Sequence, residues 1–315
     1  MIRLRDLFLV VTAFGGIVFG VMVPGWDKIG SPLVLYALMA ILFLTFLDLD
    51  FKILFKLGRD QILEVAIWSA IKLMVLPILL WGLARLTVSE WALPALLLGG
   101  ASAGVLAPFF ASLLGSDVHR PIQIVVVTSL LIPLTLPVLV EVFLGHQLTI
   151  PFSDMFRLLC LMIFVPLAAL PIARRLVPQV LDQVRRARFP LLLALIFLCN
   201  AGVFAPFSTF LRSHVGQALA ALGLSSAVAL ISTAVGLAMG HLGGRLLNGA
   251  TGAIILTFVN SMLIIVFASH FFGPRAPLLS AAYTFPFFFM IFPLRWAVRR
   301  LNAGADARKS ISART

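Results

Sequence analysis

Long apolar runs recur along the whole chain and are separated by short polar or basic segments. Each run is about as long as the roughly 20 residues that a helix needs to cross a bilayer. The runs are continuously apolar, whereas the strands of a membrane barrel would alternate apolar and polar residues. The pattern therefore predicts an all-α polytopic membrane protein with ten transmembrane helices. These lie at residues 7–24, 31–48, 61–83, 92–114, 121–144, 157–176, 190–211, 217–240, 250–272 and 277–297.

The composition agrees with this class, because 61% of the 315 residues are hydrophobic and only 11% are charged. The short connections leave no room for a separate soluble domain, so we expect residues 1–315 to form a single membrane domain. The first run has a charged start like that of a signal peptide, but it has no obvious small-residue cleavage site. We therefore expect it to be retained as the first helix.

Charge is distributed in a way that predicts the orientation of the helices. The formal net charge is +12, and the basic residues gather at the ends of the runs, which is not a nucleic-acid-binding pattern. If both termini are cytoplasmic, as positive-inside loops require, few basic residues remain on the opposite side. These are Lys28, Arg85, Arg157, Arg212 and Arg275. We expect a bacterial inner (plasma) membrane location, with residues 301–315 as a basic, disordered cytoplasmic tail.

The run at 92–114 contains residues that oppose a continuous helix. Gly99, Gly100 and Gly104 lower the cost of unwinding, and Pro108 removes a backbone donor. In lipid, freed backbone groups are tolerated only where they are buried in protein or line a wet cavity. The run therefore predicts a binding site, with a simple packing kink as the alternative.

The position of this break suggests an internal repeat. The ten runs divide into two sets of five, and because five is an odd number, the second set would enter the membrane inverted. The two repeats would span about 1–145 and 157–300. The fourth run then corresponds to the ninth, which contains Gly249, Gly252 and a mid-span Asn260. Interrupted helices at matching positions of inverted repeats indicate a transport site.

Several blocks of sequence resemble the bile acid:sodium symporter family, within the superfamily of bile acid, arsenite and auxin-type transporters. They are GGIVFGVMVPG, ALMAILFLTFLDLDFKILFK, IKLMVLPILL and the stretch from LLGSDV to IPLTLP, with FVNS and ASHF as a weaker fifth block. The resemblance implies a ten-helix carrier with a panel domain and a core domain. Discontinuous helices four and nine would cross in the core.

The sequence departs from the family at the positions that would bind sodium. The family's Ser-Asn pair in the fourth helix falls on Ala107 and Pro108, and hydroxyl positions of the fifth helix fall on Pro121 and Val125. Of the polar set in the ninth helix, Asn260 alone is kept. Sodium needs several oxygen ligands, which these side chains do not supply. The resemblance therefore identifies a divergent member in which sodium binding is doubtful, and we predict no other metal.

Lys72 takes the place of a glutamine that would be a further sodium ligand in the family, five residues before Pro77. Ionisable residues inside membrane helices are costly and are by default functional. An ammonium near a vacated cation site can replace the ion's charge, so Lys72 is a candidate cation surrogate or proton carrier. The alternative is a lysine that reaches the interface or is paired for structural reasons.

Other polar residues are weaker candidates for substrate or ion binding. Thr257 and Asn260 share a helical face and could bind substrate or satisfy freed backbone groups. Thr128 and Ser129 face the same alternatives, with hydrogen bonding to their own helix the commoner case. Asn200 could belong to a site or could join helices. We expect the aromatic stretch YTFPFFFMIF of the tenth run to face lipid or pack on the panel.

These features predict a secondary membrane transporter that moves a small organic anion by alternating access. The positive ends of half-helices and Lys72 would attract the anion. The alternatives are an efflux carrier of the same superfamily and a membrane sensor that binds a ligand without moving it. No convergent acid, base and nucleophile suggests an enzyme, and no cofactor motif is recognisable. The substrate's identity, the coupling ion, with a proton as one candidate, and the oligomeric state are left open.

Overall fold

Helices form almost all of the structure, a computed structural model that describes residues 4–47, 58–145, 150–244 and 246–298. Within these residues the only β-type pairing is an isolated antiparallel bridge between Ala103 and Val259. Five helices are long and apolar enough to cross a membrane, or seven if two bent helix pairs each count as one span. The prediction of an all-α polytopic membrane protein is therefore confirmed.

The helices of the first half follow the predicted apolar runs closely. A π-helical turn, η3 (Ile71–Val75), joins α4 to α5 in one uninterrupted helix. The helices are α1 (Leu4–Met22), α2 (Trp26–Gly30), α3 (Val34–Phe46), α4 (Arg59–Ala70), α5 (Leu76–Thr87), α6 (Ala92–Gly99), α7 (Ala107–Leu114) and α8 (His119–Leu144). Short 3-10 turns, η1 (Ser31–Leu33) and η4 (Ser89–Trp91), precede α3 and α6.

The second half is more broken than the sequence predicts. Its helices are α9 (Phe152–Leu176), α10 (Pro178–Arg186), α11 (Arg188–Phe204), α12 (Ser208–Ser213), α13 (Val215–Leu242), α14 (Gly249–Thr257), α15 (Ser261–Phe271), α16 (Arg275–Ala282) and α17 (Thr284–Phe289). The predicted run 190–211 was wrong at its end, because α11 stops at Phe204 and Pro206 lies in the turn before α12. The run 277–297 is bent by 46° where Ile291–Val298 follows α17. Helix α10 was not predicted.

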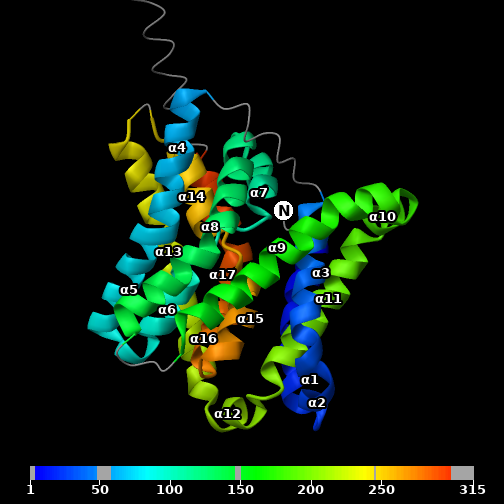
Figure 1. The fold of residues 1–315 in the computed structure, drawn as a ribbon. Helices are drawn as coiled ribbons and strands as arrows, with labels where there is room; N and C mark the ends of the chain where they lie inside the picture. Colours follow the sequence, from blue (N-terminus) through cyan, green and yellow to red (C-terminus); the bar gives the residue numbers. More distant parts are fainter. Residues whose placement is uncertain (1–3, 48–57, 146–149, 245, 299–315) are drawn as a thin grey trace, which may run out of the picture.

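The helices form two groups (Figure 1). One group, on the right in the view, has α1 and α3 packed against α11, with α9 against α3. The other contains α4 to α8 and α13 to α17, in which α13 packs on α14 and α5 on α6. Helix α15 touches α3, α9 and α11, and α8 touches α9, so these contacts join the two groups.

Close backbone approach holds α13 against α14. A Cβ added at Gly236 would lie 2.4 Å from the backbone nitrogen of Ala253, and one at Gly240 would lie 2.1 Å from Cα of Gly249. Two glycines four residues apart on one helix face are the usual means by which membrane helices approach this closely, since lipid offers little hydrophobic drive for association. The position of α14 therefore depends on these glycines.

We expect Gly240→Ala to destabilise the protein by about 1–3 kcal/mol, because the new methyl group meets backbone atoms that cannot move aside without separating the helices. The measurement is the midpoint of thermal unfolding in detergent. Gly223→Ala is the control in the same helix, since a Cβ there has nothing within 4 Å. A similar loss in both variants would contradict the packing argument.

Candidate functional site

The first helix break lies between α6 and α7. Helix α6 ends at Gly99, α7 begins at Ala107, and the intervening residues are non-helical. Pro108 stands in the first turn of α7, where a missing N–H leaves no helical bond unmade. Pro108 therefore stands at the start of α7, directly after the break that the sequence predicts in the run 92–114.

The second break lies between α14, which ends at Thr257, and α15, which begins at Ser261. The two breaks pair with each other as a short antiparallel segment centred on the Ala103–Val259 bridge. The N–H of Gly104 donates to the carbonyl of Phe258 at 2.6 Å, and the N–H of Asn260 donates to the carbonyl of Ser102 at 3.0 Å. Each break thus satisfies backbone groups that the other leaves free.

Side chains complete the hydrogen bonding at the breaks. The hydroxyl of Thr128 on α8 accepts from the N–H of Ala103 at 3.1 Å and donates to the carbonyl of Ile124 at 2.7 Å. The side-chain oxygen of Asn260 accepts from the N–H of Leu263 at 3.4 Å and so caps α15. Both residues therefore have a backbone-supporting role, which is one of the two alternatives left open by the sequence.

Lys72 is fully buried, and its side chain reaches the carboxyl end of α6. It lies in the π-helical turn between α4 and α5, and its Nζ donates to the carbonyl of Gly99, the last residue of α6, at 2.8 Å. The carboxyl end of a helix has a partial negative charge, so a cation there is favourable. Lys72 thus binds a carbonyl that the break would otherwise leave unpaired.

The end of α14 at the second break is held in a comparable way by its neighbours. The hydroxyls of Thr257, the last residue of α14, and Thr233 on α13 are 2.7 Å apart. The hydroxyl of Tyr283 donates to the carbonyl of Thr257, also at 2.7 Å. Both half-helices that end at a break are therefore capped by a buried side chain from an adjacent helix.

The comparisons with known proteins bear on this arrangement. The family model described as the Sodium Bile acid symporter family matches residues 35–205, which is more than half of the chain. The chain belongs to this family. No match was found among curated proteins. The matched region runs from α3 through α11, so it includes Lys72 and the first break but not the second.

Membership of the sodium bile acid symporter family, together with the apolar helices, makes the chain an integral membrane protein and a secondary transporter. Its substrate is accordingly a small molecule. Of the positions that the resemblance assigned to sodium ligands, Ala107 and Pro108 are buried. Other residues at the two breaks are partly exposed. They are Val105, Leu106, Asn260, Ser261 and Met262.

Two further predicted site residues, Ser129 and Asn200, take no part in the hydrogen bonds that the described residues form at the two helix breaks. Ser129 is buried next to Thr128, and its hydroxyl has no partner among the described residues. Asn200 belongs to the other group of helices, where its Nδ2 donates to the carbonyl of Ile196 on its own helix. It faces α1, since a Cβ at Gly16 would lie 3.2 Å from Cβ of Asn200. This position favours a packing role for Asn200.

Aromatic side chains fill the space beside the second break. The ring of Phe110 on α7 stacks on that of Phe258 with centroids 3.9 Å apart, and Phe287 packs edge-on against both. The expectation that the tenth run faces lipid or packs on the panel was therefore wrong for Tyr283 and Phe287, which are buried at the break. Other aromatic residues of the run are exposed: Phe285, Phe289 and Phe292.

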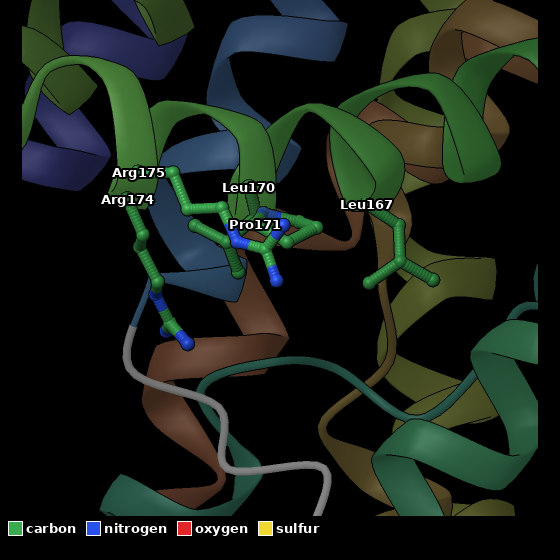
Figure 2. Close-up of a pocket in the computed structure, with 5 residues that line it drawn as sticks. All are labelled: Leu167, Leu170, Pro171, Arg174 and Arg175. Atoms are coloured by element: carbon green, nitrogen blue, oxygen red, sulfur yellow. The ribbon is translucent and has the colours of Figure 1, made fainter.

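A pocket of about 490 Å³ lies along the carboxyl-terminal half of α9. It is lined by Leu167, Leu170, Pro171, Arg174 and Arg175 (Figure 2). In Figure 2 the Arg175 side chain lies beside Leu170 and Pro171, and Arg174 lies to one side of it. The sequence does not predict this pocket, because nothing in the apolar pattern of the run 157–176 separates its two terminal arginines from those of other run ends.

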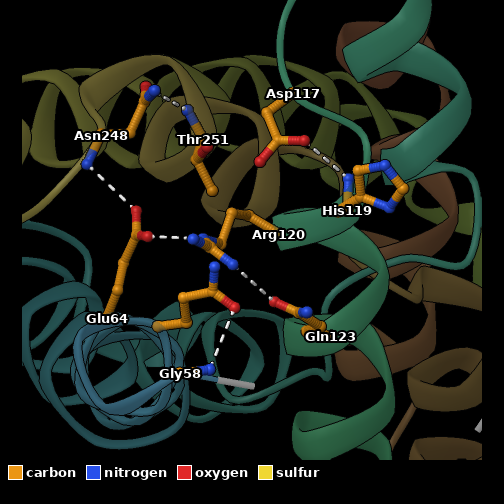
Figure 3. Close-up of polar contacts among 9 residues, drawn as sticks. Gly58, Glu64, Asp117, His119, Arg120, Gln123, Asn248 and Thr251 are labelled. Atoms are coloured by element: carbon orange, nitrogen blue, oxygen red, sulfur yellow. Dashed lines mark hydrogen bonds and ion pairs between the residues drawn. The ribbon is translucent and has the colours of Figure 1, made fainter. Parts of the chain in front are cut away.

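A buried ion pair fixes the cluster of helix ends next to η3. The Nε of Arg120 at the start of α8 lies 2.7 Å from a carboxylate oxygen of Glu64 on α4. The other oxygen of Glu64 accepts from the N–H of Asn248, the N-cap of α14, at 3.3 Å. Arg120 also donates to Gln123 (Figure 3). Three elements that flank the breaks are thus joined through one carboxylate.

We expect Glu64→Gln and Arg120→Gln each to lower the free energy of unfolding. The side chains retain 10% and 19% exposure. The loss should therefore fall between the ~1 kcal/mol of an exposed pair and the ~3–5 kcal/mol of a fully buried one. The double variant should be less destabilised than the sum of the two single variants, as measured by thermal unfolding. Strict additivity would mean that the two charges do not interact.

Proposed function

We propose that this family member moves a small organic anion across the membrane by alternating access, without requiring sodium. The observation that supports a moving carrier best is the pairing of the two helix breaks. In transporters, discontinuous helices at the bilayer midplane form the substrate and ion sites. The group of α4–α8 and α13–α17 would be the core domain, and α1, α3, α9 and α11 would be the panel against which it rocks.

The contacts between helices support a ten-helix architecture with inverted repeats. Helix α6 packs on α16, and its counterpart α14 packs on α8, so each half-helix contacts the fifth helix of the other half. The neighbouring helices correspond too, since Lys72 donates to a carbonyl at the end of α6 and the hydroxyl of Thr233 contacts the hydroxyl of Thr257 at the end of α14. Positive-inside loops would then place both termini in the cytoplasm, in a bacterial inner (plasma) membrane.

The pocket on α9 supports an anionic substrate. Its arginines can bind a carboxylate or sulfonate, while its apolar wall contacts a hydrocarbon body. At the breaks, the amino-terminal ends of α7 and α15 add partial positive charge, and Asn260 and Ser261 are polar and partly exposed there. An amphipathic organic anion matches the charge of both the pocket on α9 and the helix ends at the breaks. A cation matches neither of them.

Lys72 supports independence from sodium. In transporters with broken helices, the carboxyl end of a half-helix contributes carbonyl oxygens to a cation site. Here the side chain of Lys72 already donates to such a carbonyl, so a basic group of the chain stands where a cation would bind. The side chains of Ala107 and Pro108 offer no oxygen ligand. A lysine at this position could also exchange a proton as the carrier turns over.

An efflux carrier of the same superfamily would share these features and differ only in direction. A sensor that binds an anion without moving it would also have the pocket. The paired breaks favour transport over sensing, because a static binding site does not need two interrupted helices.

Organic anions should stabilise the purified protein to the same degree with and without sodium. A thermal-shift screen of carboxylates and sulfonates in sodium and potassium buffers measures this. Arg174→Gln/Arg175→Gln should weaken the response at least tenfold, since two charge-assisted contacts are removed. Arg85→Gln/Arg157→Gln is the matched control, because both arginines are exposed and lie outside the pocket. Stabilisation that appears only in sodium would refute the proposal.

Replacing Lys72 by glutamine should reduce anion transport at least tenfold and change its pH dependence, because the fixed charge at the end of α6 is lost. Radiolabelled uptake between pH 5 and 9 would be compared with that of Lys28→Gln, an exposed lysine outside the breaks. Size-exclusion chromatography would verify that the variant is folded. A folded variant with an unaltered pH profile would assign Lys72 a structural role only.

A further inference from the structure

Helix α10 differs from the other helices in direction and surroundings. It follows α9 after a single residue and is bent by 77° relative to α11. Figure 1 shows it projecting from one end of the molecule, beyond the helices that it connects. A helix at nearly a right angle to a membrane-spanning neighbour lies close to the membrane plane. This places α10 at the level where the bilayer meets water.

One face of α10 is apolar, and much of that face is not covered by protein. Apolar residues recur at Val177, Val180, Leu181 and Val184, a spacing that puts them on one side of a helix. Leu181 is buried, but Val180 is 53% exposed and Val177 is 44% exposed. The preceding Leu176 at the end of α9 is 74% exposed. The exposed apolar strip therefore continues from α9 onto α10.

The opposite face of α10 is polar, and both of its ends are basic. Residues 174–188 contain five arginines and a single acidic residue, Asp182. Arg174 and Arg185 both donate to the carbonyl of Leu47 at the end of α3, at 3.1 Å and 3.3 Å, so they converge on one point. Arg186 is exposed in the last turn of α10. The helix thus presents arginines beside an uncovered apolar strip.

We propose that α10 lies in the headgroup layer and that Arg185 and Arg186 bind the phosphate groups of anionic phospholipids. An amphipathic helix with an apolar face and basic polar residues inserts at the boundary of headgroups and acyl chains. Val177 and Val180 would contact acyl chains, while the guanidinium groups pair with phosphate oxygens. The proposal does not depend on the identity of the transported substrate.

Lipid titration of the full-length protein in detergent tests this binding. Phosphatidylglycerol should raise the unfolding temperature, and phosphatidylcholine should raise it less. Arg185→Gln/Arg186→Gln should require roughly 30-fold more phosphatidylglycerol for half-maximal effect, at about 1 kcal/mol for each basic residue. Arg85→Gln/Arg157→Gln removes the same charge from two exposed sites elsewhere and should titrate like wild type. An equal response in all three proteins would overturn the proposal.

A spin label tests the position of α10 independently of stability. In a Cys160→Ser/Cys199→Ser background, a label at Val180→Cys in phosphatidylglycerol nanodiscs should collide more with oxygen than with a water-soluble nickel complex. A label at Asp182→Cys, on the polar face, should show the reverse. If both labels are equally accessible to nickel, α10 lies in water and the proposal is wrong.

Discussion

The interior of a membrane offers no water to a free backbone group, and this constraint determines how the core of the protein is built. Two helices are interrupted, and each interruption would leave several donors and acceptors unpaired. Pairing Ser102 and Gly104 with Phe258 and Asn260 satisfies two of these donors and two of these acceptors. Thr128 adds a further bond to the same segment. Because each break depends on the other, the two half-helix pairs are fixed relative to each other.

The helix breaks also determine the electrostatics of the core. Helices that end inside the membrane leave partial charges there, negative at the ends of α6 and α14. The side chain of Lys72 donates to a carbonyl at the first end, and the hydroxyl of Tyr283 donates to the carbonyl of Thr257 at the second. We propose that Lys72 takes the place of a bound cation at the first end. This is the physical basis for expecting a carrier of the family's architecture without its sodium requirement.

Local patterns in the sequence predicted the apolar helices, the break near Gly99 and Gly100, and a position for Lys72 inside a helix of the membrane domain. They could not predict which backbone groups the breaks would pair with, since that depends on contacts between residues more than 150 positions apart, such as Gly104 and Phe258. The burial of Tyr283 and Phe287 was missed because an aromatic run looks alike against lipid and against protein. Helix α10 was missed because its nine residues are too short for a spanning pattern.

Uptake of a labelled organic anion into proteoliposomes that contain only potassium salts on both sides tests the central claim most directly. The ligand would be the anion that stabilises the purified protein most strongly. Our account predicts saturable uptake at a rate that does not change when sodium replaces potassium outside. Uptake that is absent in potassium and rises with external sodium would contradict it, because the ammonium of Lys72 would then not be replacing the cation.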